Sequence, residues 1–160
     1  MPDGLLALTL VTALGAGLVA GAFFAFSTFV MAALGRAPAP EGIRAMQEIN
    51  VTVINPWFMT ALFGTGAGSL AVIVAALAGW DGSYGPYLVA AGGLYLVGCL
   101  GVTMVFNVPR NNVLASLDPG TPGAANTWRR YLVEWTAWNS VRTVASLAAM
   151  AGLIGGIAAA

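Results

Sequence analysis

The chain has 160 residues, of which 59% are hydrophobic and only 8% are charged, and its mean hydropathy is +0.84. Soluble domains carry about 25% charged residues and disordered chains are poor in hydrophobic residues, so this composition excludes both classes and predicts a single membrane domain. The chain has no histidine, which excludes catalysis, haem binding and zinc binding by histidine, and its formal net charge of zero gives no indication of a nucleic-acid partner.

Four stretches are long and apolar enough to cross a bilayer, which takes about 20 residues. They lie at about 4–35, 56–79, 84–107 and 140–160, and they leave residues 36–55 and 108–139 as loops. The first stretch lacks a basic leader, and its apolar core is longer than the roughly 7–15 residues of a signal peptide, so we expect it to be retained. The pattern predicts an all-α, integral membrane four-helix bundle.

The distribution of charge predicts the orientation of this bundle. Five of the six arginines lie between the first and second stretches or between the third and fourth, and the sixth, Arg142, lies at the start of the fourth, near the expected membrane boundary. Two such loops face the same side of a membrane, and loops rich in arginine stay in the cytoplasm. We therefore expect a multi-pass protein of the inner (cytoplasmic) membrane with both termini outside and the arginine-rich loops inside.

Rows of small residues mark the apolar stretches. Gly17 and Gly21 form one row, Gly64 and Gly68 a second, and a third comprises Ala148, Gly152 and Gly156. Small side chains allow helices to approach closely in lipid. We expect these rows to pack helices inside the bundle or to form the seams of a homo-oligomer, with membrane lipids as the other partners.

The first loop has the pattern of an amphipathic helix over Glu41–Ile54, and signals for the start of the next helix follow it. Ile43 and Met46 fall on its apolar face, and this face also carries the amide of Asn50. A polar group there needs a partner, so Asn50 is either part of a site or makes a structural hydrogen bond. Asn55 and Pro56 then predict an N-cap and the first residue of the second span.

The third stretch is expected to break near Asn107, because Pro109 disfavours helical geometry in the residue that precedes it. Upstream, Tyr95, Cys99, Thr103 and Asn107 form a row at four-residue spacing, and Asn111 and Asn112 follow the proline. Cys99, the only cysteine, is expected to be a small core residue.

The fourth helix is predicted to begin with Thr121 as its N-cap and Pro122 as its first residue, and to run without interruption to the end of the last span. One face of it carries Trp128, Tyr131, Trp135, Trp138, Asn139, Arg142 and Ser146. Such a stripe is typical of an aromatic belt at the membrane surface. However, an amide and a guanidinium belong inside a bundle, where an ionisable residue at membrane depth marks a functional site.

These polar side chains all belong to the cytoplasmic end of the bundle. The group comprises Asn50, Asn107, Asn111, Asn112, Asn139, Arg142, Glu48 and Glu134. Aromatic residues from three spans occupy the same level, namely Phe23, Phe24, Phe26, Trp57, Phe58 and the tryptophans of the fourth helix. An aromatic pocket with a few amides and one guanidinium suits a flat, hydrophobic, phenolic or carbonyl-bearing small molecule.

Four segments resemble the anthrone oxygenase-like family, most of whose bacterial members are catalogued as a domain of unknown function. These segments are Phe23–Ser27, Ile49–Asn50 with Ile54–Phe58, Val105–Asn112 and Trp135–Thr143. The resemblance covers nearly the whole chain, and it implies similarity to fungal enzymes that oxidise anthrones to anthraquinones.

The sequence has no flavin or nicotinamide motif, and without histidine a metal site would need Asp and Glu alone. These absences fit an oxygenation without a cofactor or metal, in which a base removes an activated proton and the resulting carbanion reacts with O₂. We expect Arg142 to stabilise the developing charge, Asn139 and Asn107 to donate hydrogen bonds, and either Glu134 or Glu48 to act as the base. The expected substrate-binding residues are Asn50, Asn111, Asn112, Trp57, Tyr131, Trp135 and Trp138.

The alternative is a non-catalytic membrane protein that binds, transports or scaffolds. In it, Arg142 and the asparagines only fasten the cytoplasmic loops to the bundle. The two readings differ in structure, because a ligand site requires an aromatic-lined pocket with Arg142 in its wall.

Overall fold

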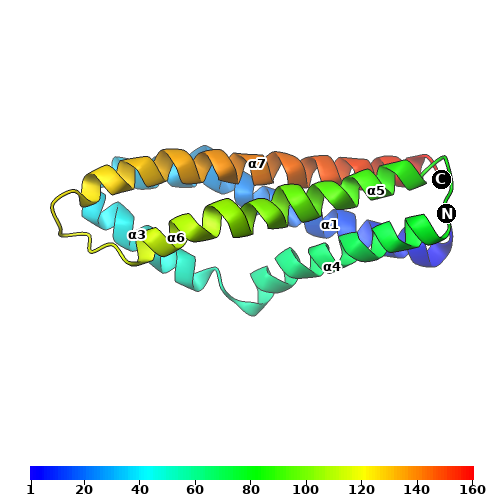
Figure 1. Ribbon diagram of the computed structural model, residues 1–160, viewed down its shortest axis with the longest axis horizontal. Coiled ribbons are helices and arrows are strands. Elements are labelled where there is room, and N and C mark those ends of the chain that lie inside the picture. Colours follow the sequence, from blue (N-terminus) through cyan, green and yellow to red (C-terminus); the bar gives the residue numbers. More distant parts are fainter.

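A computed structural model describes residues 1–160, and all of its regular structure is helical. Four long helical columns run side by side (Figure 1). The first column consists of α1 (Asp3–Ala25), a π-helical segment (Phe26–Val30) and α2 (Met31–Arg36), and the second is α4 (Pro56–Ala78). The third consists of α5 (Gly85–Gly93), two π-helical segments (Leu94–Gly101 and Thr103–Asn107) and α6 (Val108–Ala115). The fourth is α7 (Ala124–Ala158). The short helix α3 (Ala39–Thr52) links the first two columns.

Each of the four columns is long and apolar enough to cross a membrane, which confirms the predicted all-α membrane bundle. Helix α7 has 35 residues, about 52 Å at about 1.5 Å per residue, whereas the hydrocarbon core of a bilayer is about 30 Å thick. One end of α7 therefore extends beyond the apolar part of the membrane.

Both termini lie at one end of the bundle, and α3, the end of α6 and the loop 116–123 lie at the other (Figure 1). Helix α7 packs against α1 and α5, and α4 packs against the same two helices. The segments that carry the arginines thus meet at a single end of the molecule, where α3 covers the bundle.

The predicted break near Asn107 is wrong, because the third column continues through Pro109 into α6. Val108, directly before the proline, keeps helical backbone angles of φ −60° and ψ −46°. A proline lacks the N–H of a regular helical turn, and its ring crowds the preceding turn. The wider π-helical turn over Thr103–Asn107 precedes the proline, and such turns give a helix room to absorb this irregularity.

The predicted start of the second span is confirmed, but that of the fourth helix is wrong. The Asn55 side chain accepts a hydrogen bond from the Phe58 amide at 3.0 Å, and Pro56 is the first residue of α4. Helix α7 begins at Ala124, after Gly123 with a φ of 93°. The Thr121 hydroxyl is engaged elsewhere, since it donates to the Asp118 carbonyl at 2.8 Å and so does not cap a helix.

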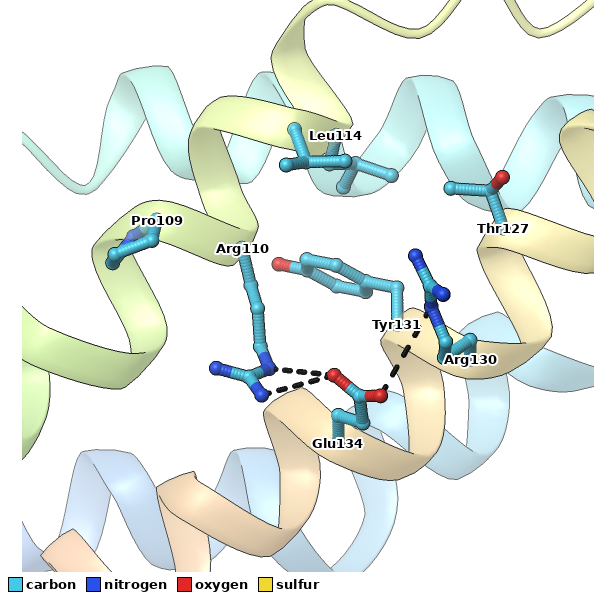
Figure 2. Close-up of a pocket in the computed structure, with 8 residues that line it drawn as sticks. Pro109, Arg110, Leu114, Thr127, Arg130, Tyr131 and Glu134 are labelled. Carbon is cyan, nitrogen blue, oxygen red and sulfur yellow. Dashed lines mark hydrogen bonds and ion pairs between the residues drawn. The ribbon is translucent and has the colours of Figure 1, made fainter.

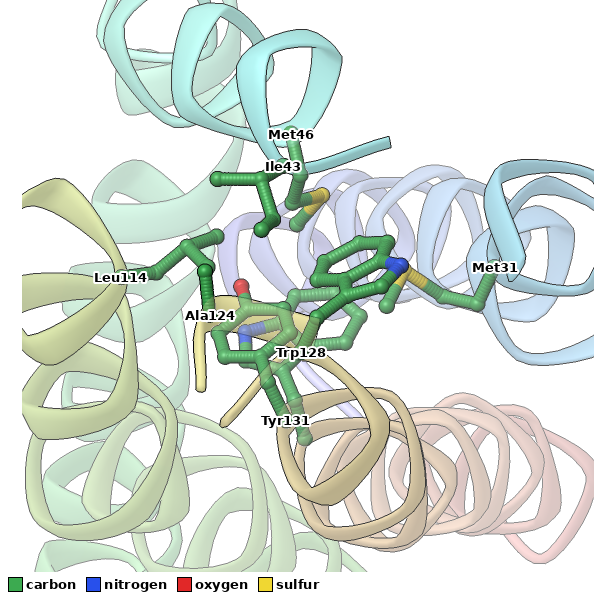
Figure 3. Packing of buried hydrophobic residues seen from close by; sticks show 8 residues of the cluster. Met31, Ile43, Met46, Leu114, Ala124, Trp128 and Tyr131 are labelled. Atoms are coloured by element: carbon green, nitrogen blue, oxygen red, sulfur yellow. The ribbon is translucent and has the colours of Figure 1, made fainter. Parts of the chain in front are cut away.

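The amphipathic helix of the first loop is confirmed as α3, which begins and ends two residues before the predicted bounds. Its residues Ile43 and Met46 are buried and pack with Leu114 of α6 and Trp128 of α7 (Figure 3). This contact holds α3 over the end of the bundle. Gln47 adds a polar anchor, because its side-chain amide donates to the carbonyls of Leu114 and Leu117 at 2.8 and 2.9 Å.

The short turn between α4 and α5 lies at the end that carries the termini. Within it, Asp81 accepts hydrogen bonds from the hydroxyl and the amide of Ser83. These bonds favour the charged carboxylate and lower the pKa of Asp81.

The small-residue rows serve contacts inside the bundle at several positions. A Cβ at Gly17 would meet Met150, one at Gly68 would meet Thr12, and one at Gly152 would meet Ala91. Gly21, by contrast, has no neighbour within 4 Å. The rows therefore bring α1, α4, α5 and α7 close together, and an oligomer seam remains a prediction.

Replacing Gly92 with Ala is expected to destabilise the protein by about 1–3 kcal/mol, the usual cost of overpacking. The new Cβ would lie 2.6 Å from a side-chain carbon of Ile73 and 2.9 Å from the Ser69 carbonyl oxygen, which belongs to the backbone of α4 and cannot move aside. Gly93→Ala is the matched control, since nothing lies within 4 Å of its Cβ. Thermal unfolding in detergent measures both, and equal melting temperatures would contradict this account of helix packing.

Candidate functional site

A cavity of about 330 Å³ lies between α1, α3, α4, the third column and α7. Most of its lining is apolar, and the polar exceptions are Asn50, Thr103, Asn111 and Arg142, with the indole of Trp135 beside them. The apolar lining consists of Ala22, Phe23, Phe26, Met46, Ile49, Val53, Ile54, Phe58, Met59, Leu62, Phe63, Met104 and Val108. We call this space the aromatic cavity.

The aromatic cavity borders the outer surface of the bundle between α4 and the third column. Three of its lining residues are largely exposed, with exposed fractions of 71% for Ile54, 51% for Phe63 and 58% for Met104. Phe63 lies seven residues after Pro56, about 10 Å along a helix that crosses the membrane. This exposed and apolar border of the cavity therefore belongs to a helix that is long and apolar enough to cross a membrane.

Arg142 forms part of the wall of this cavity and is buried, with an exposed fraction of 5%. Its guanidinium lies over the Phe23 ring at 3.9 Å from the centroid and 5.3 Å from that of Trp135. It donates to the Thr103 hydroxyl at 3.2 Å and to the Asn139 side-chain oxygen. The Nε atom is buried without a hydrogen-bond partner.

The part of α7 that follows Arg142 is shorter than the hydrocarbon core of a bilayer is thick. Arg142 precedes Ala158, the last residue of α7, by 16 positions, about 24 Å along the helix. That length fits within the hydrocarbon core of about 30 Å. The guanidinium is surrounded by the apolar interior of the bundle.

Asn139 is fully buried one turn before Arg142 and positions it. Its amide nitrogen donates to the Phe23 carbonyl and to the Ser27 hydroxyl, both at 2.7 Å, while its oxygen accepts from Arg142. The two acceptors lie at the junction of α1 with the π-helical segment Phe26–Val30. Asn139 thus fastens α7 to the first column and leaves its own side chain no free donor.

Asn111 and Trp135 form a second polar group in the wall, and Tyr131, which lines the smaller pocket beside α6 and not this cavity, is bonded to Asn111. The Asn111 oxygen accepts from the Tyr131 hydroxyl at 3.0 Å and from the Trp135 indole at 2.7 Å. Because an indole N–H only donates, the Asn111 atom that faces it is the oxygen, and the amide nitrogen of Asn111 remains free to donate. Asn50 completes the group with a long contact of 3.5 Å from its nitrogen to the Tyr131 hydroxyl.

The stripe on α7 lies inside the bundle and is not a belt facing lipid. Trp128, Tyr131 and Trp135 are buried and stack in sequence, with ring centroids 5.6 and 6.1 Å apart. Figure 3 shows Trp128 and Tyr131 among the apolar side chains of α3 and α6. The amphipathic face of α7 therefore points toward α3 and the cavity.

Several predicted site residues lie away from the aromatic cavity. The Trp57 side chain is 87% exposed on the outside of α4, and Glu48 and Asn112 are exposed as well. Asn107 is buried and donates to the Trp135 carbonyl at 3.2 Å, while Trp138 stacks on Phe106 with ring centroids 3.6 Å apart. Neither Asn107 nor Trp138 lines the cavity.

Glu134 lines a separate and smaller pocket of about 190 Å³ on the outer face of α6 and α7 (Figure 2). There it pairs with Arg110 at 2.9 Å and with Arg130 at 4.0 Å. The predicted base is therefore engaged by two arginines outside the aromatic cavity. No group of three or more Cys, Asp or Glu side chains lies close enough together to hold a metal ion.

Two contributors to the site had no predicted role. Thr103 accepts from Arg142, and Ser27 accepts from Asn139. Thr103 belongs to the row Tyr95, Cys99, Thr103 and Asn107, but the sequence did not show that it contacts Arg142. Ser27 belongs to one of the segments that carry the family resemblance, and its neighbour on α7 is 112 positions away in the sequence.

Comparison with known proteins adds a family. The family model described as anthrone oxygenase matches residues 54–152, more than half of the chain. These residues include Asn111, Tyr131, Trp135 and Arg142, whereas α1 and α3 precede the match. No curated protein and no solved structure matches the chain.

Proposed function

The chain belongs to the anthrone oxygenase family, and we propose on that basis that it is a membrane oxidoreductase that oxidises a hydrophobic phenolic or polycyclic compound with O₂. The observation that carries the proposal is the aromatic cavity between apolar helices with the buried Arg142 in its wall. A protein in which Arg142 and Asn139 only fastened loops would need no such cavity. Their hydrogen bonds run to other transmembrane columns.

The chemistry suits a substrate with a methylene group between aromatic rings and a carbonyl in the same ring system. Loss of one methylene proton gives an anion whose charge is shared with the carbonyl oxygen, and a guanidinium donor at that oxygen stabilises it. The anionic carbon is oxidised by O₂ and forms a C–O bond to a peroxide. Protonation and loss of water then leave a ketone, so that CH₂ and O₂ become C=O and H₂O.

Proton removal is assigned differently from the expectation based on sequence. Glu48 and Glu134 both lie outside the aromatic cavity, and its own polar side chains offer amides and a hydroxyl but no carboxylate. We therefore propose that Arg142 favours ionisation of the substrate and that water accepts the proton. Under this proposal Glu134→Gln and Glu48→Gln proteins keep their turnover, and loss of turnover in either would reinstate a carboxylate base.

The substrate is proposed to reach the cavity through the lipid. The mouth beside Ile54, Phe63 and Met104 is apolar and exposed, and we propose that it lies within the membrane. A polycyclic compound concentrates in the bilayer, so this route gives it direct access to Arg142.

The proposal is tested by purifying the protein into lipid nanodiscs and adding simple anthrones under air. We expect formation of the corresponding anthraquinone, measured by its absorbance, with consumption of one molecule of O₂ per molecule of quinone. Empty nanodiscs measure spontaneous oxidation. Rates equal to that background for a panel of anthrones would reject the activity, and saturable binding without turnover would favour the non-catalytic alternative.

We further propose that the protein lies in the inner (cytoplasmic) membrane with its termini outside. The arginine-bearing segments share the end of the bundle that carries α3 (Figure 1), and the positive-inside rule assigns that end to the cytoplasm. An alkaline phosphatase fused to the C-terminus should be active in this orientation, and activity of a fusion within residues 116–123 instead would reverse it.

A further inference from the structure

Arg142 is a buried cation for which the protein supplies no acidic partner. Of the six acidic residues, only Glu134 pairs with arginines, namely Arg110 and Arg130. Asp3 and Asp81 lie at the far end of the bundle, and Glu41, Glu48 and Asp118 belong to α3 and the loop beyond α6. The positive charge inside the bundle is therefore uncompensated.

The guanidinium also has hydrogen-bonding capacity to spare. Its contacts are one hydroxyl, one amide oxygen and the faces of two aromatic rings, and Nε has no partner. Buried charges in proteins are normally paired and fully hydrogen-bonded. Arg142 is nine-tenths buried, lines a cavity and keeps an N–H without an acceptor. These three properties indicate a binding site for a ligand that carries an acceptor.

The rest of the cavity wall agrees with this charge. The amide nitrogen of Asn111 is free to donate because its oxygen already accepts from Tyr131 and Trp135. No carboxylate lines the cavity to repel an anion. Its remaining walls are aromatic and aliphatic, and its volume of about 330 Å³ lies in the range of ligand pockets, about 300–1,000 Å³.

We infer that the aromatic cavity binds its ligand as an anion, an aromatic phenolate or carboxylate whose oxygen pairs with Arg142. This deepens the proposed function, because it concerns the same cavity, but it is a statement about binding and not about turnover. The ligand oxygen accepts from Arg142, and the ring system lies against the apolar wall. The ion pair that the protein leaves open is completed by the ligand.

The test compares two probes of equal shape, 2-naphthoate and the neutral 2-naphthamide. Binding is measured without O₂ by tryptophan fluorescence in nanodiscs of zwitterionic phosphatidylcholine, with empty nanodiscs to correct for partition into lipid. We expect naphthoate to bind at least about tenfold more tightly, although lipid itself favours the neutral probe. Equal affinities in the unmodified protein would overturn the inference without any variant.

Variants identify the cation that is responsible. Asn139→Asp places a carboxylate at the atom that already accepts from Arg142, so we expect the preference for naphthoate to fall to about onefold. Arg142→Met should have the same effect. Arg110→Met is the matched control, since Arg110 belongs to the separate pocket around Glu134, and it should retain the preference.

The outcomes also separate this inference from the proposed activity. A preference for naphthoate that depends on Arg142, in a protein that oxidises no anthrone, would support the inference and reject the activity. Turnover of anthrones without a preference for naphthoate would support the activity and reject the inference. A preference lost in Arg110→Met but kept in Asn139→Asp would place the anion in the pocket of Figure 2 and overturn the assignment to Arg142.

Discussion

An Arg142→Met protein is expected to lose its turnover by about 100-fold or more while its melting temperature stays the same or rises. The loss of rate is of the size found when a donor to a developing oxyanion is removed. The stability is the balance of two effects. The substitution removes a costly buried charge that has no acidic partner, and replacing buried ionic groups by apolar residues of similar volume is often neutral or stabilising by about 1–4 kcal/mol. It also removes the donor to the Asn139 oxygen and the Thr103 hydroxyl, a smaller cost that the relief of the charge offsets. Met also retains an unbranched apolar stem beside Phe23, although it is shorter than Arg and lacks the group that lies over the ring.

This combination distinguishes a functional arginine from a structural one. Turnover of an anthrone and thermal unfolding are measured on the same preparation, with Arg110→Met as the control for loss of an arginine near the same end of the bundle. Arg110→Met should keep its turnover. A melting temperature of Arg142→Met well below that of the unmodified protein, with activity lost in proportion to unfolding, would show that Arg142 mainly holds the bundle together.

The second large effect is expected at Asn139, where replacement by Leu should lower the free energy of unfolding by about 1–3 kcal/mol. The substitution leaves an Arg142 N–H without its acceptor and removes the buried bond from Asn139 to the Phe23 carbonyl, which keeps only its backbone donor. Each orphaned buried group costs about 1–3 kcal/mol in soluble proteins, and interhelical hydrogen bonds in membranes average about 0.6 kcal/mol, so the sum falls between these scales.

Asn112→Leu provides the matched control for Asn139→Leu. Asn112 lies exposed on α6, and its replacement changes the composition in the same way while leaving the bundle interior unaltered. Thermal unfolding in detergent should separate the two variants by several degrees. Equal melting temperatures would mean that Asn139 does not fasten α7 to the first column. Turnover of Asn139→Leu should fall as well, because Arg142 loses the oxygen that orients it.

Local sequence signals were sufficient where one element decided the outcome. The four spans followed from uninterrupted apolar stretches, the apolar face of α3 from its periodicity, and the cap of α4 from Asn55 and Pro56. The interior position of the α7 stripe was also foreseeable, because Asn139 and Arg142 share a face with tryptophans that a lipid-facing belt would not place beside them.

Local signals failed where a neighbouring turn altered the geometry. Pro109 predicted a break, but the π-helical turn before it lets the third column continue. Thr121 predicted a cap, but its hydroxyl bonds to Asp118 and the helix begins after Gly123. Trp57 was expected to bind substrate, but its side chain lies on the outer side of α4, because hydropathy identifies a span while only packing decides the rotation of its helix.

The sequence by itself determined that this is a membrane bundle whose arginine-bearing loops share one end, because hydropathy and charge act on each segment independently of the others. Only the tertiary structure decided that Arg142 faces a cavity and that no carboxylate lies against it. Glu134 and Arg142 lie two turns apart on the same helix, yet one belongs to an outer pocket with Arg110 and the other to the interior with Phe23. Which charges are paired depends on how several helices pack against one another, and the sequence of one segment alone does not show this packing.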